Sequence, residues 1–241
     1  MCHISYIINE SKKNKMKYLF TSSVGNPCKR FLKKIIKRFG YEDFDYIICV
    51  YDDTEFDEKI FKYCKIIYKK EYQWNFLAQY VTPGVCKKYE YIFTWADDLD
   101  IENFSYKNFI KIMKQNKLYM AQPALTHKSY YSHIITLKDQ NYKIGRFTDF
   151  VEIMAPVFSR EAYPHFWKMI SENFSRFGWG YDILAESLCG YKRMGIIDCE
   201  TITHKKPVQS HKTEAPSDMA RMLKKYSSFK CSQKIIYGPL K

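Results

Sequence analysis

The stretch YEYIFTWADDLD, residues 89–100, decides the fold. Apart from one glutamate, its first seven residues are aromatic or β-branched, which is the composition of a buried β-strand. Three carboxylates, Asp97, Asp98 and Asp100, follow at once. In open α/β sheets, ligands bind beyond the carboxyl ends of the strands. We therefore expect an α/β protein with this acidic cluster at the mouth of its sheet.

Strands and helices alternate on both sides of this stretch. The run KYLFTSS at 17–23 predicts a buried strand, and the basic segment after it has apolar residues at helical spacing until Gly40. The alternation predicts a mostly parallel sheet flanked by helices in a single domain. Further strands are expected at 45–50 and 65–68, and further helices at about 72–88 and 105–115.

The second half of the chain is less regular. We expect a helix at about 160–174, another from Tyr181, and a last strand at 194–204. We divide the chain into an N-terminal extension (1–16), the α/β domain (17–207) and a basic C-terminal tail with one short helix (208–241). Three more apolar runs predict strands, at 118–122, 132–137 and 150–158.

The length and composition of the chain limit the classes of protein to which it can belong. The 241 residues are enough for one large core, and the 17% aromatic content excludes a disordered chain. The net charge of +13 attracts polyanions in general. Eight single cysteines without a CxxC pair, and no run of roughly 18 apolar residues, indicate a cytoplasmic or peripheral protein without a membrane span.

The acidic cluster has a chemical interpretation and a simpler one. Three carboxylates this close repel one another unless a cation lies among them, and hard oxygen ligands suit Mg²⁺ or Mn²⁺. A neutral imidazole at His204, where the last strand ends, would complete the metal shell. The simpler interpretation is that Asp100 caps a helix, the other two acids are solvated, and His204 is structural.

A second candidate site follows Gly178-Trp179-Gly180. Asp182 begins a helix there and is a candidate general base, while Trp179 is placed to stack on a sugar face. Asp182 is equally explained as a first-turn acid favoured by the helix dipole. Glu152, in an apolar run, is either a rival base, a ligand of sugar hydroxyls or a surface residue. Asp52, at the end of another strand, binds ribose or base, or simply forms an acidic turn.

The motifs YIFTWADDLDIENF, MAQPAL, VEIMAPVFSREAY, GWGYDILAE and IIDCETITH occur in an order that resembles the domain-of-unknown-function family numbered 707. The likeness covers about residues 17–207. The plan of strand, Asp-rich turn, Gly-Trp-Gly with an acid, and a late histidine also resembles inverting glycosyltransferases of the GT-A (Rossmann-like) fold, in particular the β-galactosyltransferase type.

This second resemblance implies a site and an activity. It implies that Mn²⁺ or Mg²⁺ is bound by Asp98, Asp100 or Asp97 together with His204, that Asp182 is the base, and that the donor is a nucleotide sugar such as a UDP-sugar. The acceptor would be a glycan hydroxyl, and no nucleic-acid partner is expected. The chain departs from the pattern at Ala96, where an acid is usual, so the aspartates that bind the metal stay open. The nucleotide would lie near Thr21, Ser22 and Asp52, with Asp97 and Trp179 beside it.

Two alternatives from other classes use the same features. An RNA-binding or membrane-surface protein would use the basic charge, for example on the helix at 28–39, and its binding would weaken steeply with salt. A metal-dependent phosphohydrolase or nuclease would use the same carboxylates. Of the three functions, sugar transfer alone accounts for the Gly-Trp-Gly loop.

Overall fold

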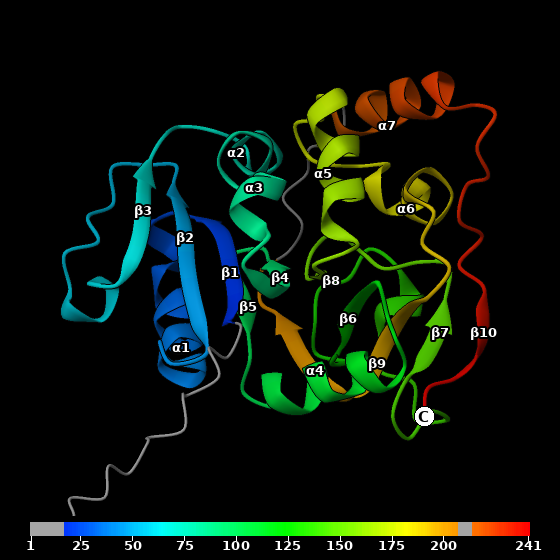
Figure 1. Cartoon of the computed structure of the whole chain (residues 1–241), viewed down its shortest axis with the longest axis horizontal. Coiled ribbons are helices and arrows are strands. Elements are labelled where there is room, and N and C mark those ends of the chain that lie inside the picture. The colour runs from blue at the N-terminus through cyan, green and yellow to red at the C-terminus, as the bar shows by residue number, and fades with distance from the viewer. Residues whose placement is uncertain (1–16, 207–213) are drawn as a thin grey trace, which may run out of the picture.

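The computed structural model describes residues 17–206 and 214–241, so the predicted N-terminal extension lies outside the described residues. A mixed β-sheet runs through the described chain with helices on both faces (Figure 1), which confirms the predicted α/β class. Within the described ranges the sheet has ten strands, and nine of them form the order β10-β7-β9-β6-β8-β4-β1-β2-β3.

One half of the sheet is parallel, as the alternation predicted. β4 (Tyr89–Thr94), β1 (Lys17–Val24), β2 (Phe44–Val50) and β3 (Cys64–Tyr68) lie side by side in the same direction. The central residues of β4, β1 and β2 are almost all buried, and strands covered on both faces have continuous apolar runs for this reason. The acidic cluster therefore follows the carboxyl end of a central strand, β4.

The other half of the sheet is mixed. β6 (Met120–Leu125) pairs in parallel with β9 (Met194–His204), while β8 (Val157–Ser159) inserts antiparallel between β6 and β4. At the edge, β7 (Arg146–Thr148) and β10 (Ile236–Pro239) add two antiparallel strands. The short β5 (Leu99–Asp100) pairs antiparallel with the end of β9.

Three local predictions were wrong. Residues 132–137 contain a 3₁₀ turn, η3 (Ile134–Thr136), rather than a strand. Of 150–158 only the last two residues belong to a strand, because the chain before them turns along the cavity described below. The helix expected at 72–88 is split into α2 (Gln73–Tyr80) and α3 (Pro83–Cys86), since proline cannot continue a helix and Thr82 caps the second one.

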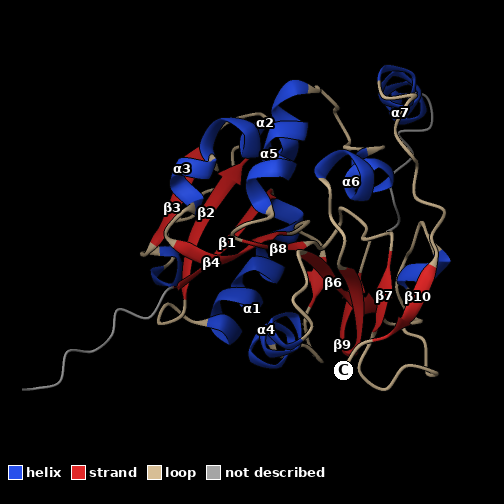
Figure 2. Ribbon diagram, turned by 45° about the vertical axis from the view of Figure 1, so that its right-hand side comes forward, coloured by secondary structure: helices blue, strands red, loops and turns tan. Residues whose placement is uncertain are grey.

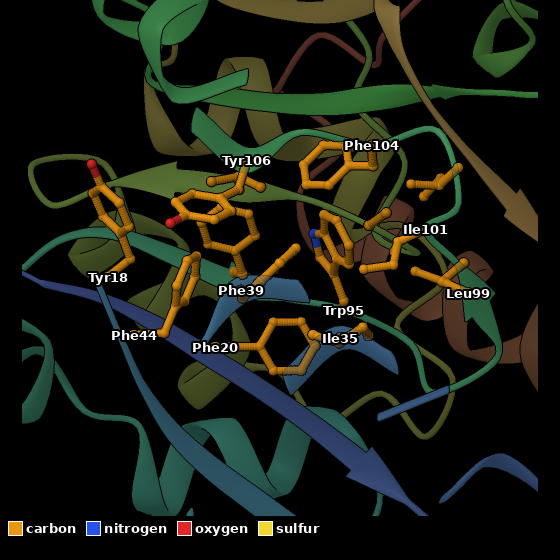
Figure 3. Packing of buried hydrophobic residues seen from close by; sticks show 14 of the residues in the cluster. Tyr18, Phe20, Ile35, Phe39, Phe44, Trp95, Leu99, Ile101, Phe104 and Tyr106 are labelled. Carbon is orange, nitrogen blue, oxygen red and sulfur yellow. The ribbon is translucent and has the colours of Figure 1, made fainter. Parts of the chain in front are cut away.

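An aromatic core lies between the sheet and two helices, α1 (Lys29–Phe39) and α4 (Tyr106–Gln115). Phe39, at the end of α1, lies at its centre (Figure 3), with its ring centroid 4.7 Å from that of Phe44 and 6.2 Å from that of Trp95. Basic residues of α1 are bound on the outer side, for example Lys33 to Glu58 at 2.5 Å. This amphipathic helix thus packs its apolar side on the sheet, and part of its basic side is neutralised within the chain.

The opposite face of the sheet is covered by a second group of helices. α2, α3, α5 (Tyr163–Glu172) and α6 (Tyr181–Cys189) share one buried cluster with Leu19 and Ile92 of the sheet. α7 (Glu214–Lys225) adds Met222 to this cluster. Figure 2 shows α2, α3 and α5 above the parallel half and α6 and α7 above the mixed half.

The C-terminal residues 214–241 contain more than the predicted short helix. After α7 the chain passes α6, where the amide of Ser232 donates to the carbonyl of Ile183 at 2.8 Å, and then forms β10. Figure 1 shows this segment in red along the edge of the sheet. The split between a domain and a tail thus stays a prediction, while β10 is an unforeseen part of the sheet. Across the described ranges, no helix is both long and apolar enough to cross a membrane.

Candidate active site

A cavity of about 1140 Å³ opens at the carboxyl ends of β1 and β4. Its walls come from the turn after β4, the start of α2, the loop before α6, residues 152–154 and the C-terminal segment. Open α/β sheets bind ligands at this edge. Of the predicted site residues, the cavity is lined by Asp97, Glu152, Trp179, Asp182 and His204.

Asp98 and His204 form a pair beside the cavity. The pairing of β5 with β9 places Leu99 opposite His204, which brings the Asp98 carboxylate within 3.0 Å of His204 Nε2. His204 Nδ1 lies 2.8 Å from the carbonyl oxygen of Tyr130, which accepts its proton and fixes the ring. Burial lowers the pKa of His204, but the hydrogen bond to Asp98 and its charge outweigh burial and raise it. Nε2 of His204 and the carboxylate of Asp98 are thus within hydrogen-bond distance of one another.

Asp97 points to the other side of the same turn. Its Oδ2 accepts a hydrogen bond from the hydroxyl of Tyr51 at 3.1 Å and one from the amide of Gly25 at 3.4 Å. Burial, and then the charge of Asp98, raise its pKa to about 6. A side chain at Gly25 would meet the ring of Tyr51 at 2.5 Å, so glycine is required for this close approach. Asp97 therefore joins the first strand's turn to the acidic cluster.

Asp100 lies outside the cavity lining. Its carboxylate is nearly buried and is 3.4 Å from the ammonium of Lys34 and 3.5 Å from that of Lys205. Its charge is thus balanced by Lys34 of α1 and by Lys205, which follows β9. As a metal ligand Asp100 stays a prediction, and the geometry favours Asp98 and His204 over it.

Glu152 and Asp182 form a pair of buried carboxyl groups in the wall of the cavity. Burial, followed by the charge of Asp182, raises the pKa of Glu152 to about 8. Burial also raises the pKa of Asp182, to about 6, although the amide of Ile183 donates to its Oδ1 at 2.9 Å. Paired acids whose pKa values are driven apart are suited to separate acid and base roles.

The Gly-Trp-Gly loop sets the position of Asp182. Gly178 and Gly180 have φ of +75° and +101°, a region that favours glycine, and Gly180 precedes the first residue of α6. A Cβ at Gly178 would lie 2.3 Å from Nε1 of Trp74, so the loop packs directly on this indole. Trp179 between the glycines is 37% exposed at the cavity rim, where its ring is free to stack on a ligand.

Three of the predicted nucleotide-binding residues, Thr21, Ser22 and Asp52, do not line the cavity, whereas Asp97 and Trp179 do. Thr21 and Ser22 are buried in β1, and their hydroxyl oxygens have no hydrogen-bond partner in the described part of the chain. Asp52 accepts hydrogen bonds from the amides of Asn26 (2.8 Å) and Thr54 (3.0 Å) in a separate shallow depression. Asp52 thus ties the turns after β1 and β2 together.

Several residues of the cavity were not expected from the sequence. Ser23 and Tyr51 line it on the β1 side, and Tyr72 does so at the start of α2, where its hydroxyl accepts from Nε of Arg176. Lys234 reaches the cavity from the C-terminal segment. Except for the strand ends at Ser23 and Tyr51, no motif or periodicity marks these positions.

The number of side chains that could coordinate a metal ion decides what kind of metal site is possible here. Over residues 17–206 and 214–241 no group of three or more His, Cys, Asp and Glu side chains is arranged to hold a metal ion. Asp98 and His204 provide two donors. Mg²⁺ is commonly held by one or two carboxylates with substrate phosphates completing its octahedron, so a two-donor site fits a cation that is shared with a diphosphate.

The architecture and the cavity at the carboxyl edge define a GT-A-like α/β protein. The chain belongs to the family described as "Protein of unknown function (DUF707)", whose profile matches residues 3–235. No curated protein matches the sequence.

Two solved structures of S. aureus TarS share the fold. TarS 1-349 in complex with UDP-GlcNAc has a TM-score of 0.58 at 11% identity, with 86% of this chain and 64% of the TarS chain covered. TarS 1-349 alone has a TM-score of 0.50 at 10% identity, with 88% and 73% covered. This chain thus spans less than two thirds of the TarS chain in the complex. At these identities the likeness concerns the fold.

Proposed function

We propose that this protein is a glycosyltransferase that moves a sugar from a nucleotide diphosphate donor, a UDP-sugar, to a hydroxyl group of a glycan acceptor. The observation that carries the proposal is one cavity with a buried carboxyl pair, Glu152 and Asp182, and the Asp98–His204 pair beside it. The similar TarS structure contains UDP-GlcNAc, which supports the choice of a UDP-sugar.

The donor end of the cavity is assigned to the Asp98 side. There Asp98 and His204 would hold Mn²⁺ or Mg²⁺, which supplies positive charge to the leaving diphosphate when bound. Asp97 is held by Tyr51 and Gly25, so its proposed role is beside the nucleotide rather than on the metal. Thr21, Ser22 and Asp52 support the strand ends against which the nucleotide would lie.

Asp182 is the proposed general base of an inverting transfer. Its pKa of about 6 leaves it ionised near neutral pH, whereas that of Glu152, about 8, keeps this second carboxyl protonated. Asp182 takes the proton of the acceptor hydroxyl while the oxygen bonds to the anomeric carbon and the bond to the diphosphate breaks. Protonated Glu152 donates a hydrogen bond to a sugar hydroxyl, and Trp179 stacks on a sugar ring.

Single free thiols, among them the buried Cys28, Cys49 and Cys86, are typical of a reducing compartment, and we place the reaction in the cytoplasm. The test is a screen of nucleotide sugars with simple glycosides as acceptors, in which release of nucleotide diphosphate is measured with MnCl₂ and with EDTA. Release that depends on both metal and one donor is expected. Turnover of nucleic acid or of phosphate esters without any sugar transfer would instead favour a phosphohydrolase.

A further inference from the structure

The backbone at Lys234 is held in a conformation that lysine rarely adopts. Its φ is +56°, and within the described ranges Lys117 is the other non-glycine residue with a positive φ. The left-handed region is unfavourable for residues with a Cβ, so it persists where surrounding contacts impose it, often at functional sites. At Lys234 one such contact is the hydrogen bond from its amide to Oγ of Ser232 at 3.0 Å.

The side chain of Asp149 holds the backbone in this conformation by hydrogen bonds to both neighbours of Lys234. Its buried carboxylate accepts hydrogen bonds from the amides on both sides of Lys234, from Gln233 at 2.7 Å and from Ile235 at 2.6 Å. The amide of Asp149 in turn donates to the carbonyl of Ile235 at 3.2 Å. One side chain thus binds the backbone on both sides of Lys234. The C-terminal segment is therefore fixed next to the cavity at the position of this lysine.

The side chain of Lys234 lines the cavity. Its ammonium lies 5.5 Å from the ring centroid of Phe150, and it makes no ion pair with any residue that the structure describes. Burial raises the pKa values of Glu152 and Asp182, and the charge of Lys234 opposes this effect at both. The ammonium is thus close to the carboxyl pair without being bound by it.

This position identifies the kind of group that Lys234 would meet. The proposed base must face the acceptor hydroxyl, so a cation beside the base lies on the acceptor side. The exposed rings of Trp179 and Tyr131 line the same cavity, where sugar rings would stack. We propose that Lys234 binds an anionic group, a carboxylate or a phosphate, on the sugar acceptor. The assignment to the acceptor rests on the proposed function.

The test compares three probes, D-glucose, D-glucuronate and glucose 6-phosphate, by ligand-observed NMR titration of the full chain. Wild-type protein is expected to bind at least one anionic probe more tightly than glucose. Lys234→Met is expected to weaken the binding of that probe by about tenfold, the effect of losing one charge-assisted hydrogen bond. The binding of glucose should be unchanged. The matched control is Lys230→Met, which removes an exposed lysine of the same segment that does not line the cavity.

Lys234→Gly separates binding from folding. Glycine removes the ammonium and relieves the backbone, so the melting temperature should be unchanged or higher while the preference for the anionic probe is lost. Equal binding of all three probes by wild type, or a preference that survives in Lys234→Met, would overturn the proposal. The stronger of the two anionic probes identifies carboxylate or phosphate as the bound group.

Donor binding is measured separately, as thermal stabilisation by UDP with MnCl₂. If Lys234→Met abolishes this stabilisation, Lys234 belongs to the donor site and the acceptor assignment fails, while the proposed transferase stands. If wild type shows no stabilisation but keeps its preference for an anionic sugar, the proposed function fails and the anion site stands.

Discussion

Replacing Glu152 by glutamine should make the protein more stable, by an amount that grows with pH. Burial, together with the charge of Asp182, raises the pKa of Glu152 from 4.5 to about 8 in the folded protein. Below pH 4.5 the carboxyl is protonated in both the folded and the unfolded chain. As the pH rises from 4.5 to 8 the unfolded chain releases this proton and the folded chain keeps it, so stability is lost over this range.

The size of the effect follows from the difference between the pKa of Glu152 in the unfolded chain, 4.5, and its pKa in the folded protein, about 8. One pH unit corresponds to about 1.4 kcal/mol, so the penalty is on the order of 3 kcal/mol at pH 7 and 5 kcal/mol above pH 8. Glutamine keeps the shape and lacks the ionisation. The free energy of unfolding of Glu152→Gln should therefore exceed that of wild type by these amounts near pH 7 and above 8, and by roughly 1 kcal/mol at pH 5.

The assay is urea unfolding followed by tryptophan fluorescence at pH 5, 7 and 8.5 in the presence of EDTA. Glu102→Gln, which makes the same change at an exposed glutamate, is the control, and the two variants are compared at each of the three pH values. A difference between Glu152→Gln and wild type that does not change with pH would refute the reasoning. It would mean that the charge of this carboxylate is compensated in the fold, for instance by the ammonium of Lys234.

Three further predictions concern the site. Asp98→Ala should abolish the thermal stabilisation by UDP and MnCl₂, measured relative to the melting temperature of the free variant because the substitution also removes the hydrogen bond to His204; retained stabilisation would remove Asp98 from the metal site. Asp182→Asn should keep that stabilisation and lose transfer by about 10²–10⁴-fold, the usual contribution of a general base, and full transfer would exclude this base. Gly178→Ala should cost about 1–3 kcal/mol more than Gly190→Ala in thermal unfolding. Gly178 and Gly190 have φ of +75° and +72°, but at Gly178 the new methyl would meet Trp74, whereas at Gly190 nothing lies within 4 Å, so equal losses would contradict the packing.

The parallel half of the fold was predictable because its signals are local. β1, β2 and β4 are buried on both faces, so each is a continuous apolar run, and α1 shows its packed side as an apolar stripe. The segment 150–158 has a similar composition for a different reason. Phe150, Val151 and Ile153 are buried without strand pairing, because they pack in apolar clusters between the sheet and its covering elements. An apolar run reports burial, and the type of backbone depends on what covers it.

The residues of the candidate site were predictable only in part. The strand end before Asp97 and the loop before Asp182 are local features, and both acids do line the cavity. The contact between Asp98 and His204 joins residues 106 positions apart and depends on the pairing of β5 with β9, which spacing does not reveal. The same pairing also decides that Asp100 turns toward lysines rather than toward His204.

Lys234 shows why a charge count could not locate the site. In the sequence it is one of 39 basic residues, in a stretch that looks like a solvated tail. In the fold, Asp149 orders the backbone around it, and Asp149 itself is placed by the end of β7 and by the pairing of β7 with β10. The ammonium of Lys234 is therefore placed near Glu152 and Asp182 by the edge of the sheet, through β7, β10 and Asp149. A substitution that weakens β10 should then lower affinity for an anionic acceptor while the donor end of the cavity, built from β1, β4 and β9, keeps its geometry.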